Sequence, residues 1–348
     1  MIRRLTIASL TVCVIAACQG TTNRPSVDSA LTSSSDSADC RTIEHELGET
    51  EVCGQPQRIV VLGPYVLEPL VALDVQPVAF ADHIAFHQGE YDNPSQHIPY
   101  LGHHITQPIV NLGTAYSPSI ESILKLQPDL ILGTSFNNAD QYETLSDIAP
   151  TLLLNWDDSK RNLRAIGQAI DRSDQAEQLI RETEQQIVEA RDAFISLVET
   201  QPKLLLLVSS RFPELYIGNQ TAGLCRTLTE SLGFEPMSLP ETNSSESNTP
   251  LAPVSLEALP DLNEADSIIL LGSNFSELQS FSTMNEFEEH QLSNLKQEWE
   301  ENAIAQSLDA SKAGRVYFIP AYMCLGLPGP IGTELYLEEL KQQLLTPD

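Results

Sequence analysis

One structural unit occurs twice in this chain of 348 residues. The first copy, SPSIESILKLQPDLILGTSFN, spans residues 117–137, and the second, APVSLEALPDLNEADSIILLGSNF, spans residues 252–275. In each copy a proline and a serine precede a glutamate and a short apolar run, which indicates a helix start. An aspartate, a hydrophobic strand and a loop rich in Gly, Ser and Asn then follow. A chain that builds the same unit twice is expected to fold into two related halves.

Short apolar runs alternate with helical patterns in both halves. Strands are predicted at residues 58–62, 77–82, 129–132, 151–154, 203–208, 267–271 and 315–319, and helices at residues 64–73, 222–232 and 331–345. Strands that are separated by helices pair in parallel, and helices then cover both faces of the sheet. We therefore expect an α/β protein of two Rossmann-like lobes with parallel-rich sheets.

The segment between the two halves, residues 159–200, follows a helical period that breaks at residues 171–174, where Ser173 can cap a new start. It predicts a long, rigid helix that joins the lobes, whereas the polar stretch 239–249 predicts a mobile loop. The expected parts are a signal peptide (1–17), a disordered tether (18–39), an N-terminal hairpin (40–57), an N-terminal α/β lobe (58–158), the linking helix (159–200) and a C-terminal α/β lobe (201–348).

The N-terminus, MIRRLTIASLTVCVIAACQG, has two arginines and an apolar run too short to span a bilayer. The run ends in Ile15-Ala16-Ala17-Cys18, which resembles a bacterial lipobox. That resemblance implies cleavage before Cys18 and a lipid on its thiol, so the protein is expected at the periplasmic or cell-surface face of the cytoplasmic membrane. An ordinary signal peptide with a chance cysteine is the alternative. The Ser, Thr and Asp that follow up to residue 39 are typical of a disordered tether.

The formal net charge is -29, and loss of residues 1–17 with Arg3 and Arg4 brings it to -31. A protein this acidic repels nucleic acid and anionic lipid headgroups. Nucleic acid is therefore not an expected partner, and an anionic ligand would need a locally positive cleft.

Four cysteines remain after the lipobox, and four cysteines allow three pairings. Cys40 and Cys53 bracket RTIEHELGETEV, whose centre is typical of a hairpin turn, so a local disulfide is expected there. Cys225 and Cys324 would then pair by elimination, or would remain as two small buried side chains.

Several stretches resemble the class III substrate-binding proteins of ABC importers, and the iron-siderophore-binding lipoproteins among them most. These stretches are RIVVLGPYVLEPLVALDVQPVAFAD, SPSIESILKLQPDLIL, YETLSDIAPTLLL and AGRVYFIPAYMCLGLPGPIGTELYLEEL. The resemblance covers residues 41–345 and rests on the order and spacing of the stretches. It implies a monomeric receptor without catalysis or cofactor, which captures a ferric siderophore between two lobes and delivers it to a membrane permease driven by an ATPase.

The glutamate in each copy of the doubled unit, Glu121 and Glu257, lies in a first helical turn, where a carboxylate is favoured by the helix dipole. This stabilisation of the helix start would by itself explain why a glutamate occurs at both positions. The family resemblance adds a functional explanation, because one surface glutamate per lobe at this helix start pairs with permease arginines in these receptors.

Ligand contacts are predicted from the chemistry of a ferric siderophore, whose polar or anionic oxygens call for arginine donors and aromatic walls. The candidates are Arg211, Trp156, Tyr322, Tyr65, Phe136, Asn137, Phe212 and Tyr216. Structural alternatives exist: Tyr216 as strand core, Tyr65 packed on the first helix, and Arg211 paired with Glu214.

Three other functions are compatible with parts of the sequence. A vitamin B12 or haem carrier would share the fold, and haem would need an axial ligand such as Tyr65 or Tyr322. His83 and His87, with Glu90, have a spacing that could hold a bare metal ion if the segment were helical, although the turn that follows favours a loop. An exported hydrolase is disfavoured because the sequence has no G-x-S-x-G, H-E-x-x-H or phosphate-binding glycine loop.

Overall fold

The computed structural model describes residues 39–156, 158–218, 223–238, 251–275, 281 and 283–345. The signal peptide, Cys18, the tether up to residue 38 and the loop at 239–249 lie outside these residues. Within the described part of the chain, no helix is both long enough and apolar enough to cross a bilayer.

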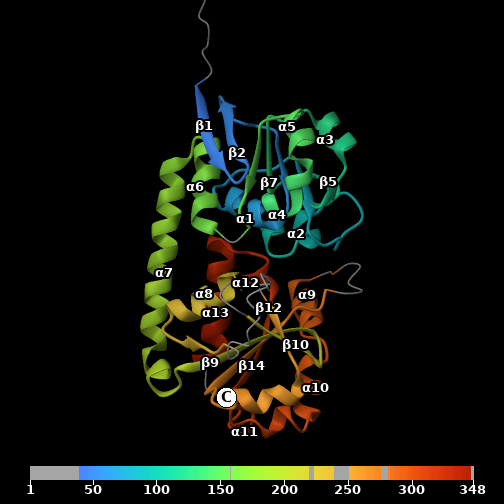
Figure 1. Cartoon of the computed structure of the whole chain (residues 1–348). Coiled ribbons are helices and arrows are strands. Elements are labelled where there is room, and N and C mark those ends of the chain that lie inside the picture. Colours follow the sequence, from blue (N-terminus) through green and yellow to red (C-terminus); the bar gives the residue numbers. More distant parts are fainter. Residues whose placement is uncertain are drawn as a thin grey trace, which may run out of the picture. The chain divides into compact units, whose positions relative to one another are not determined.

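An antiparallel hairpin opens the described chain (Figure 1). Its strands are β1 (Cys40–His45) and β2 (Gly48–Cys53). Cys40 lies opposite Cys53 in the register, and a disulfide with an S–S distance of 2.06 Å joins them. The turn is held on the N-terminal lobe, because the backbone N–H of Glu46 donates to Leu153 O at 3.0 Å.

The N-terminal lobe is built on one six-stranded sheet with the order β6-β5-β4-β3-β7-β8. The strands are β3 (Ile59–Leu62), β4 (Ala79–Asp82), β5 (Val110–Thr114), β6 (Ser117–Pro118), β7 (Leu130–Thr134) and β8 (Thr151–Leu154). All neighbours pair in parallel except the short edge strand β6. The helices are α1 (Pro64–Ala72), α2 (Pro94–His97), α3 (Ile120–Leu126), α4 (Ser135–Asn138) and α5 (Tyr142–Ser146), with 3-10 turns η1 (Leu101–His104) and η2 (Ala139–Gln141).

The C-terminal lobe has a second six-stranded sheet, in the order β12-β10-β9-β13-β14 with β11 paired to β9. Its strands are β9 (Lys203–Arg211), β10 (Glu214–Gly218), β11 (Glu235–Pro236), β12 (Leu251–Val254), β13 (Ser267–Gly272) and β14 (Val316–Pro320). Its helices are α8 (Gly223–Ser231), α9 (Met284–Gln291), α10 (Leu295–Glu301), α11 (Asp309–Lys312), α12 (Tyr322–Leu325) and α13 (Pro330–Leu345), with 3-10 helices η3 (Leu256–Leu262) and η4 (Ala305–Ser307). The sheet is parallel at β11, β9, β13 and β14 and antiparallel at β10 and β12.

Strand residues are buried on both faces, as expected for sheets covered by helices. Val61 belongs to a large apolar cluster that continues through the linking helix into the C-terminal lobe, whereas Val60 and Leu62 face a separate cluster under α3. The alternation of successive side chains between two cores makes a central strand such as β3 apolar throughout.

The segment 159–200 contains two helices where one broken linking helix was predicted. Helix α6 (Ser159–Ala169) packs on α1 and on the hairpin, and only α7 (Ser173–Thr200) links the lobes. The chain reverses at Asp171, whose φ of 60° lies in the left-handed region. Close packing of the two helices needs Gly167, because a Cβ there would lie 2.6 Å from the Cβ of Ala176. Ser173 begins α7 but does not cap it with its side chain.

The doubled unit has matching structures in the two lobes. The first copy forms β6, α3 and β7, and the second forms β12, η3 and β13. Ser119 caps α3 by accepting from Ser122 N at 3.3 Å, whereas Ser255 makes no side-chain cap for η3. The second copy contains Pro260, which cannot continue an α-helix, so it forms a 3-10 helix instead.

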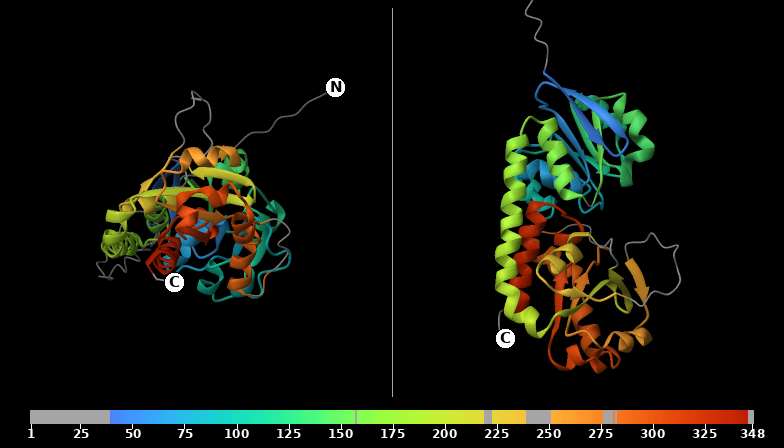
Figure 2. Two further views of the ribbon diagram at one scale, coloured as in Figure 1. Left: turned by 90° about the horizontal axis from the view of Figure 1, so that it is seen from below. Right: turned by 60° about the vertical axis from the view of Figure 1, so that its left-hand side comes forward.

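The lobes meet at helix α13 as well as through α7. Helix α13 packs along α7, as Figure 2 shows, and its first turn also contacts α1. There Glu68, fully buried on α1, accepts from the backbone N–H groups of Gly329 at 2.6 Å and Gly332 at 2.7 Å. Within the C-terminal lobe, a disulfide between Cys225 on α8 and Cys324 on α12 spans 99 residues of sequence.

Candidate functional site

The strand order of the N-terminal lobe reverses beside β3, since β4 lies on one side of it and β7 on the other. In open α/β sheets, ligands bind beyond the carboxyl ends of the strands at such a reversal. Tyr65 follows β3 and Asn137 follows β7. The two loops approach closely at Gly63, whose φ of 117° favours glycine and whose hypothetical Cβ would lie 3.9 Å from Asn137 Nδ2.

Aromatic rings from both lobes meet at these strand ends. The group, called the cleft rings below, consists of Tyr65, His83, Phe86 and Trp156 from the N-terminal lobe and Phe275, Phe287 and Tyr322 from the C-terminal lobe. Ring centroids lie 5.5 Å apart between His83 and Tyr322 and 5.9 Å apart between Phe86 and Phe275. Tyr65 lies between His83 at 5.7 Å and the partly buried Trp156 at 6.1 Å.

Three buried polar atoms at strand ends have no hydrogen-bond partner among the described residues. They are Asp82 Oδ2 at the end of β4, Asn137 Nδ2 after β7 and Ser209 Oγ near the end of β9. Asp82 and Ser209 are each 1% exposed. A buried polar group without a partner costs free energy, and such groups gather where a ligand completes the hydrogen bonds. Asp82 and Asn137 therefore indicate a polar binding site at the strand ends of the N-terminal lobe, and Ser209 lies at the strand ends of the C-terminal lobe, opposite Gly272.

Asp82 and His83 form a pair inside this site. Asp82 Oδ1 accepts from the backbone N–H of His83 at 2.7 Å and lies 2.8 Å from His83 Nδ1. Burial raises the pKa of Tyr65 to about 12, and the nearby Asp82 charge adds to that shift. Burial and the same charge raise the pKa of Tyr322 well above its usual value. Both phenols are therefore neutral hydrogen-bonding groups at physiological pH.

Several predicted ligand residues lie at or beside the cleft rings. Tyr65 and Trp156 belong to them, and Asn137 contributes one of the unpartnered atoms. Tyr322 is also one of the rings, but it is 1% exposed and fills the space between the lobes instead of lining an open surface. Phe136, which precedes Asn137, is 78% exposed and available to a ligand or partner.

The other three predicted contacts have different surroundings. Arg211 is 77% exposed and forms an ion pair with Glu214 at 2.7 Å. Phe212 packs edge-on against Trp299, with centroids 6.2 Å apart, in the core on the other face of the C-terminal sheet. Tyr216 lies on β10 and packs against the large apolar cluster. These are the structural alternatives already considered for Arg211 and Tyr216.

Sequence reasoning missed Asp82, Phe86, Ser209, Phe275 and Phe287, and it placed His83 at a rim or in solvent. A signal was available for Asp82 and His83, because both stand at the end of a predicted strand. No local pattern identifies Phe86 and Phe275 as neighbours, since their contact joins the two lobes.

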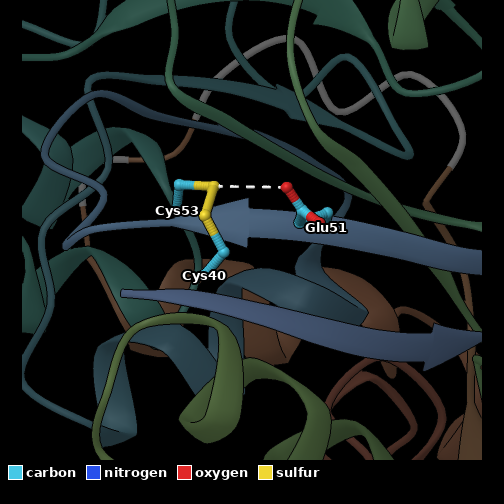
Figure 3. Close-up of side chains that lie close together, drawn as sticks. All are labelled: Cys40, Glu51 and Cys53. Atoms are coloured by element: carbon cyan, nitrogen blue, oxygen red, sulfur yellow. Dashed lines mark hydrogen bonds between the residues drawn. A yellow bond between two sulfur atoms is a disulfide. The ribbon is translucent and has the colours of Figure 1, made fainter. Parts of the chain in front are cut away.

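The histidine spacing that was considered as a disfavoured metal site does not bring these side chains together. His83 pairs with Asp82, whereas His87 stacks on His97 with centroids 3.7 Å apart and places Nε2 at 3.0 Å from Glu90 O. Among the described residues, one group of potential metal ligands lies close together, namely Cys40, Glu51 and Cys53. Glu51 Oε1 lies 3.6 Å from Cys53 Sγ (Figure 3), but the disulfide leaves no thiolate to bind a metal ion.

A separate cavity of about 330 Å³ lies beside α7 and is lined by apolar side chains such as Leu163, Ile180 and Leu228. None of the unpartnered buried polar atoms in the described chain belongs to its lining. The cleft rings therefore remain the better candidate for a polar ligand.

The two glutamates of the doubled unit are exposed surface groups. Glu121 on α3 is 80% exposed and pairs with Lys125 at 2.6 Å, one helical turn later. Glu257 lies exposed in the first turn of η3. Both carboxylates are accessible to a partner, one on each lobe.

Comparison with known proteins identifies the family. The sequence profile of the periplasmic binding proteins matches residues 59–323, from β3 into α12. The chain belongs to this family. Periplasmic binding proteins of this kind capture substrates for transport, and the match spans both lobes and the linking helix.

Two relatives of this periplasmic binding protein are named for binding ferric citrate. The Fe(3+)-citrate-binding protein YfmC of Bacillus subtilis is 27% identical over 289 residues, which cover 81% of this chain and 79% of the relative. The Fe(3+) dicitrate-binding periplasmic protein FecB of Escherichia coli is 39% identical over 114 residues, or 32% of this chain and 35% of its own length.

Solved structures confirm the predicted class III fold. Staphylococcus aureus SirA complexed with staphyloferrin B has a TM-score of 0.68 at 22% identity, covering 88% of this chain and 98% of SirA. Bacillus subtilis FeuA complexed with ferri-bacillibactin has a TM-score of 0.64 at 22% identity, covering 88% of this chain and 100% of FeuA.

Proposed function

We propose that this periplasmic binding protein captures a ferric siderophore, an Fe(III) chelate, in the cleft between its lobes and delivers it to an ABC importer. The observation that carries the proposal is the meeting of aromatic rings and unpartnered polar atoms from both lobes at the carboxyl ends of the strands. Such chelates present apolar backbones and polar oxygens on one surface, which rings and hydrogen-bond donors can bind together. The iron-chelate receptors among its relatives support the same cargo.

A lipid anchor, a permease and an ATPase would act together with the receptor. Cleavage before Cys18 and lipidation of its thiol would tether the mature chain, with residues 19–39 as the leash. The receptor acts as a monomer without catalysis or a resident cofactor, and it docks on a permease that a cytoplasmic ATPase drives. Two lipoproteins of Bacillus subtilis among its relatives support the anchor.

Haem is the alternative cargo that can be judged from the ionisation of the tyrosines at the site. A tyrosine that ligates haem iron does so as a phenolate. The raised pKa values of Tyr65 and Tyr322 oppose that ionisation, and the neighbouring Asp82 carboxylate contributes to both shifts. The site therefore favours an iron that arrives fully coordinated by its chelator.

Tryptophan fluorescence tests the cargo directly. Trp156 touches the cleft rings, whereas Trp299 is 1% exposed in the opposite core, so a Trp299→Phe background isolates the informative residue. The chain that starts after Cys18 is titrated with ferric hydroxamate, ferric catecholate, ferric citrate, haem, cobalamin and Zn(II). We expect saturable quenching by a ferric chelate and not by its iron-free form.

Two comparisons control this titration. A Trp156→Phe variant in the natural Trp299 background should lose the response, and circular dichroism should report the same fold for both variants. Quenching by haem, cobalamin or zinc without any response to a ferric chelate would retain the fold and refute the cargo.

A further inference from the structure

Basic side chains are engaged away from the cleft rings. Of the 19 lysines and arginines, Arg3, Arg4 and Arg24 precede the described residues, and the undescribed segments after residue 39 contain none, which leaves 16. Thirteen of these have a carboxylate or carbonyl partner elsewhere. The other three, Arg181, Arg191 and Lys296, lie on α7 and α10. In the described chain, no ring contact or hydrogen bond of the cleft rings involves a lysine or arginine.

The two arginines on elements near the cleft are already neutralised. Arg211, at the end of β9, pairs with Glu214 at 2.7 Å and points into solvent. Arg226, on the helix that the disulfide joins to α12, pairs with Glu230 at 2.9 Å. An anionic cargo would have to compete with a carboxylate for either cation.

The Asp82–His83 pair adds no positive charge. It consists of one carboxyl group and one imidazole, whose Oδ1 and Nδ1 atoms lie 2.8 Å apart. Another carboxylate lies close by, because Glu288 accepts from the hydroxyl of Tyr100, whose ring stacks on Tyr322 at 5.9 Å. Two carboxyl groups therefore lie beside the cleft rings, and no lysine or arginine of the described chain bonds to either of them; charges inside a partly buried site interact much more strongly than in water.

The hydrogen-bond donors at these strand ends are neutral groups. Asn137 offers an amide N–H, Ser209 offers a hydroxyl, and Tyr65 is a neutral phenol. Amide, hydroxyl and phenol groups suit the uncharged carbonyl and N–O oxygens of a hydroxamate, whereas carboxylates and catecholates are matched best by arginine.

We propose that Asp82 restricts the cargo to ferric chelates without net negative charge, of the trihydroxamate class, with His83 and the neutral donors contacting the chelate. This inference rests on the proposed function and narrows it. It separates this chain from a ferric-citrate receptor, even though two of its relatives carry that name.

Fluorescence titration of the chain after Cys18, in the Trp299→Phe background, tests whether the protein selects chelates without net negative charge, which is called the charge rule below. The probes are ferrichrome (net charge 0), ferrioxamine B (+1), ferric enterobactin (-3) and ferric dicitrate. We expect ferrichrome or ferrioxamine B to bind at least about tenfold more tightly than either anionic chelate. The reverse order of affinities would overturn the charge rule while retaining the siderophore function. Failure of all four to bind would overturn both.

Asp82→Asn tests the residue itself. Asparagine keeps the size and the Oδ1 acceptor for His83, and it removes the charge. We expect the affinity for ferric enterobactin to rise about tenfold relative to the affinity for ferrichrome. Asp192→Asn, an exposed position on α7, is the matched control because it changes the net charge of the chain by the same amount. Equal effects of the two substitutions would assign the selectivity to overall charge and refute the role of Asp82.

Discussion

Replacing Glu121 and Glu257 together by alanine is expected to reduce cellular uptake of the cargo to background, a loss of at least about tenfold, without changing its affinity for the isolated protein. Each carboxylate is exposed on one lobe, in the first turn of the corresponding helix of the doubled unit. Exposed charges steer an encounter with a complementary surface more than they stabilise the complex. The permease arginines expected from the family resemblance would have to displace Lys125 from Glu121, which an exposed pair permits.

Uptake of radioactive iron chelate by cells that lack the natural protein measures this effect, and titration of the purified variant measures binding. A control variant with Glu143→Ala and Glu301→Ala also removes one exposed glutamate from each lobe, on α5 and α10. It should transport normally. Normal transport by the Glu121 and Glu257 variant would show that these carboxylates are not the docking contacts.

The second large effect is a change in the pH dependence of stability in Glu68→Gln. Burial raises the pKa of Glu68 to about 7, although the backbone N–H groups of Gly332 and Gly329 act in the opposite direction. A carboxyl group whose pKa is raised by folding stabilises the folded state below its unfolded pKa of 4.5, and this stabilisation is lost as pH rises through about 7. The loss is about 3 kcal/mol, since one pKa unit corresponds to about 1.4 kcal/mol.

Glutamine at position 68 does not titrate, so the variant should gain about 3 kcal/mol relative to the wild type between pH 4 and pH 8. Urea unfolding at a series of pH values measures the two free energies of unfolding. Glu143→Gln, at an exposed position, should run parallel to the wild type over the same range. If the free energy of unfolding of Glu68→Gln followed that of the wild type at every pH, this carboxyl group would have the same pKa in the folded and unfolded chains.

Features encoded locally were predictable from the sequence. The doubled unit, the apolar strands and the final helix appear near their expected positions because each depends on a short periodic pattern. Strands β10 and β12 and the fold-back of α6 were missed. These two strands have no distinctive apolar run, and the reversal depends on Asp171 and on the close approach at Gly167.

The candidate site was predictable only in part, for a different physical reason. Tyr65, Trp156 and Asn137 follow predicted strands, so topology alone brings them to one edge of the sheet. Phe86 and Phe275 meet through the arrangement of the lobes, which no local pattern encodes. Arg211 pairs with the nearby Glu214, and its contact with a ligand stays a prediction.

The contact of Glu68 with the start of α13 has a consequence for motion. Helix α7 is one attachment between the lobes, and the buried carboxylate, bonded to two backbone N–H groups, is another. Two rigid bodies joined at two separate places retain a single easy rotation, about the line that connects those places. The lobes can therefore rock about this axis, whereas sliding or twisting would break the two hydrogen bonds of the buried Glu68 side chain, and the cleft rings should reassemble in the same register at each closure.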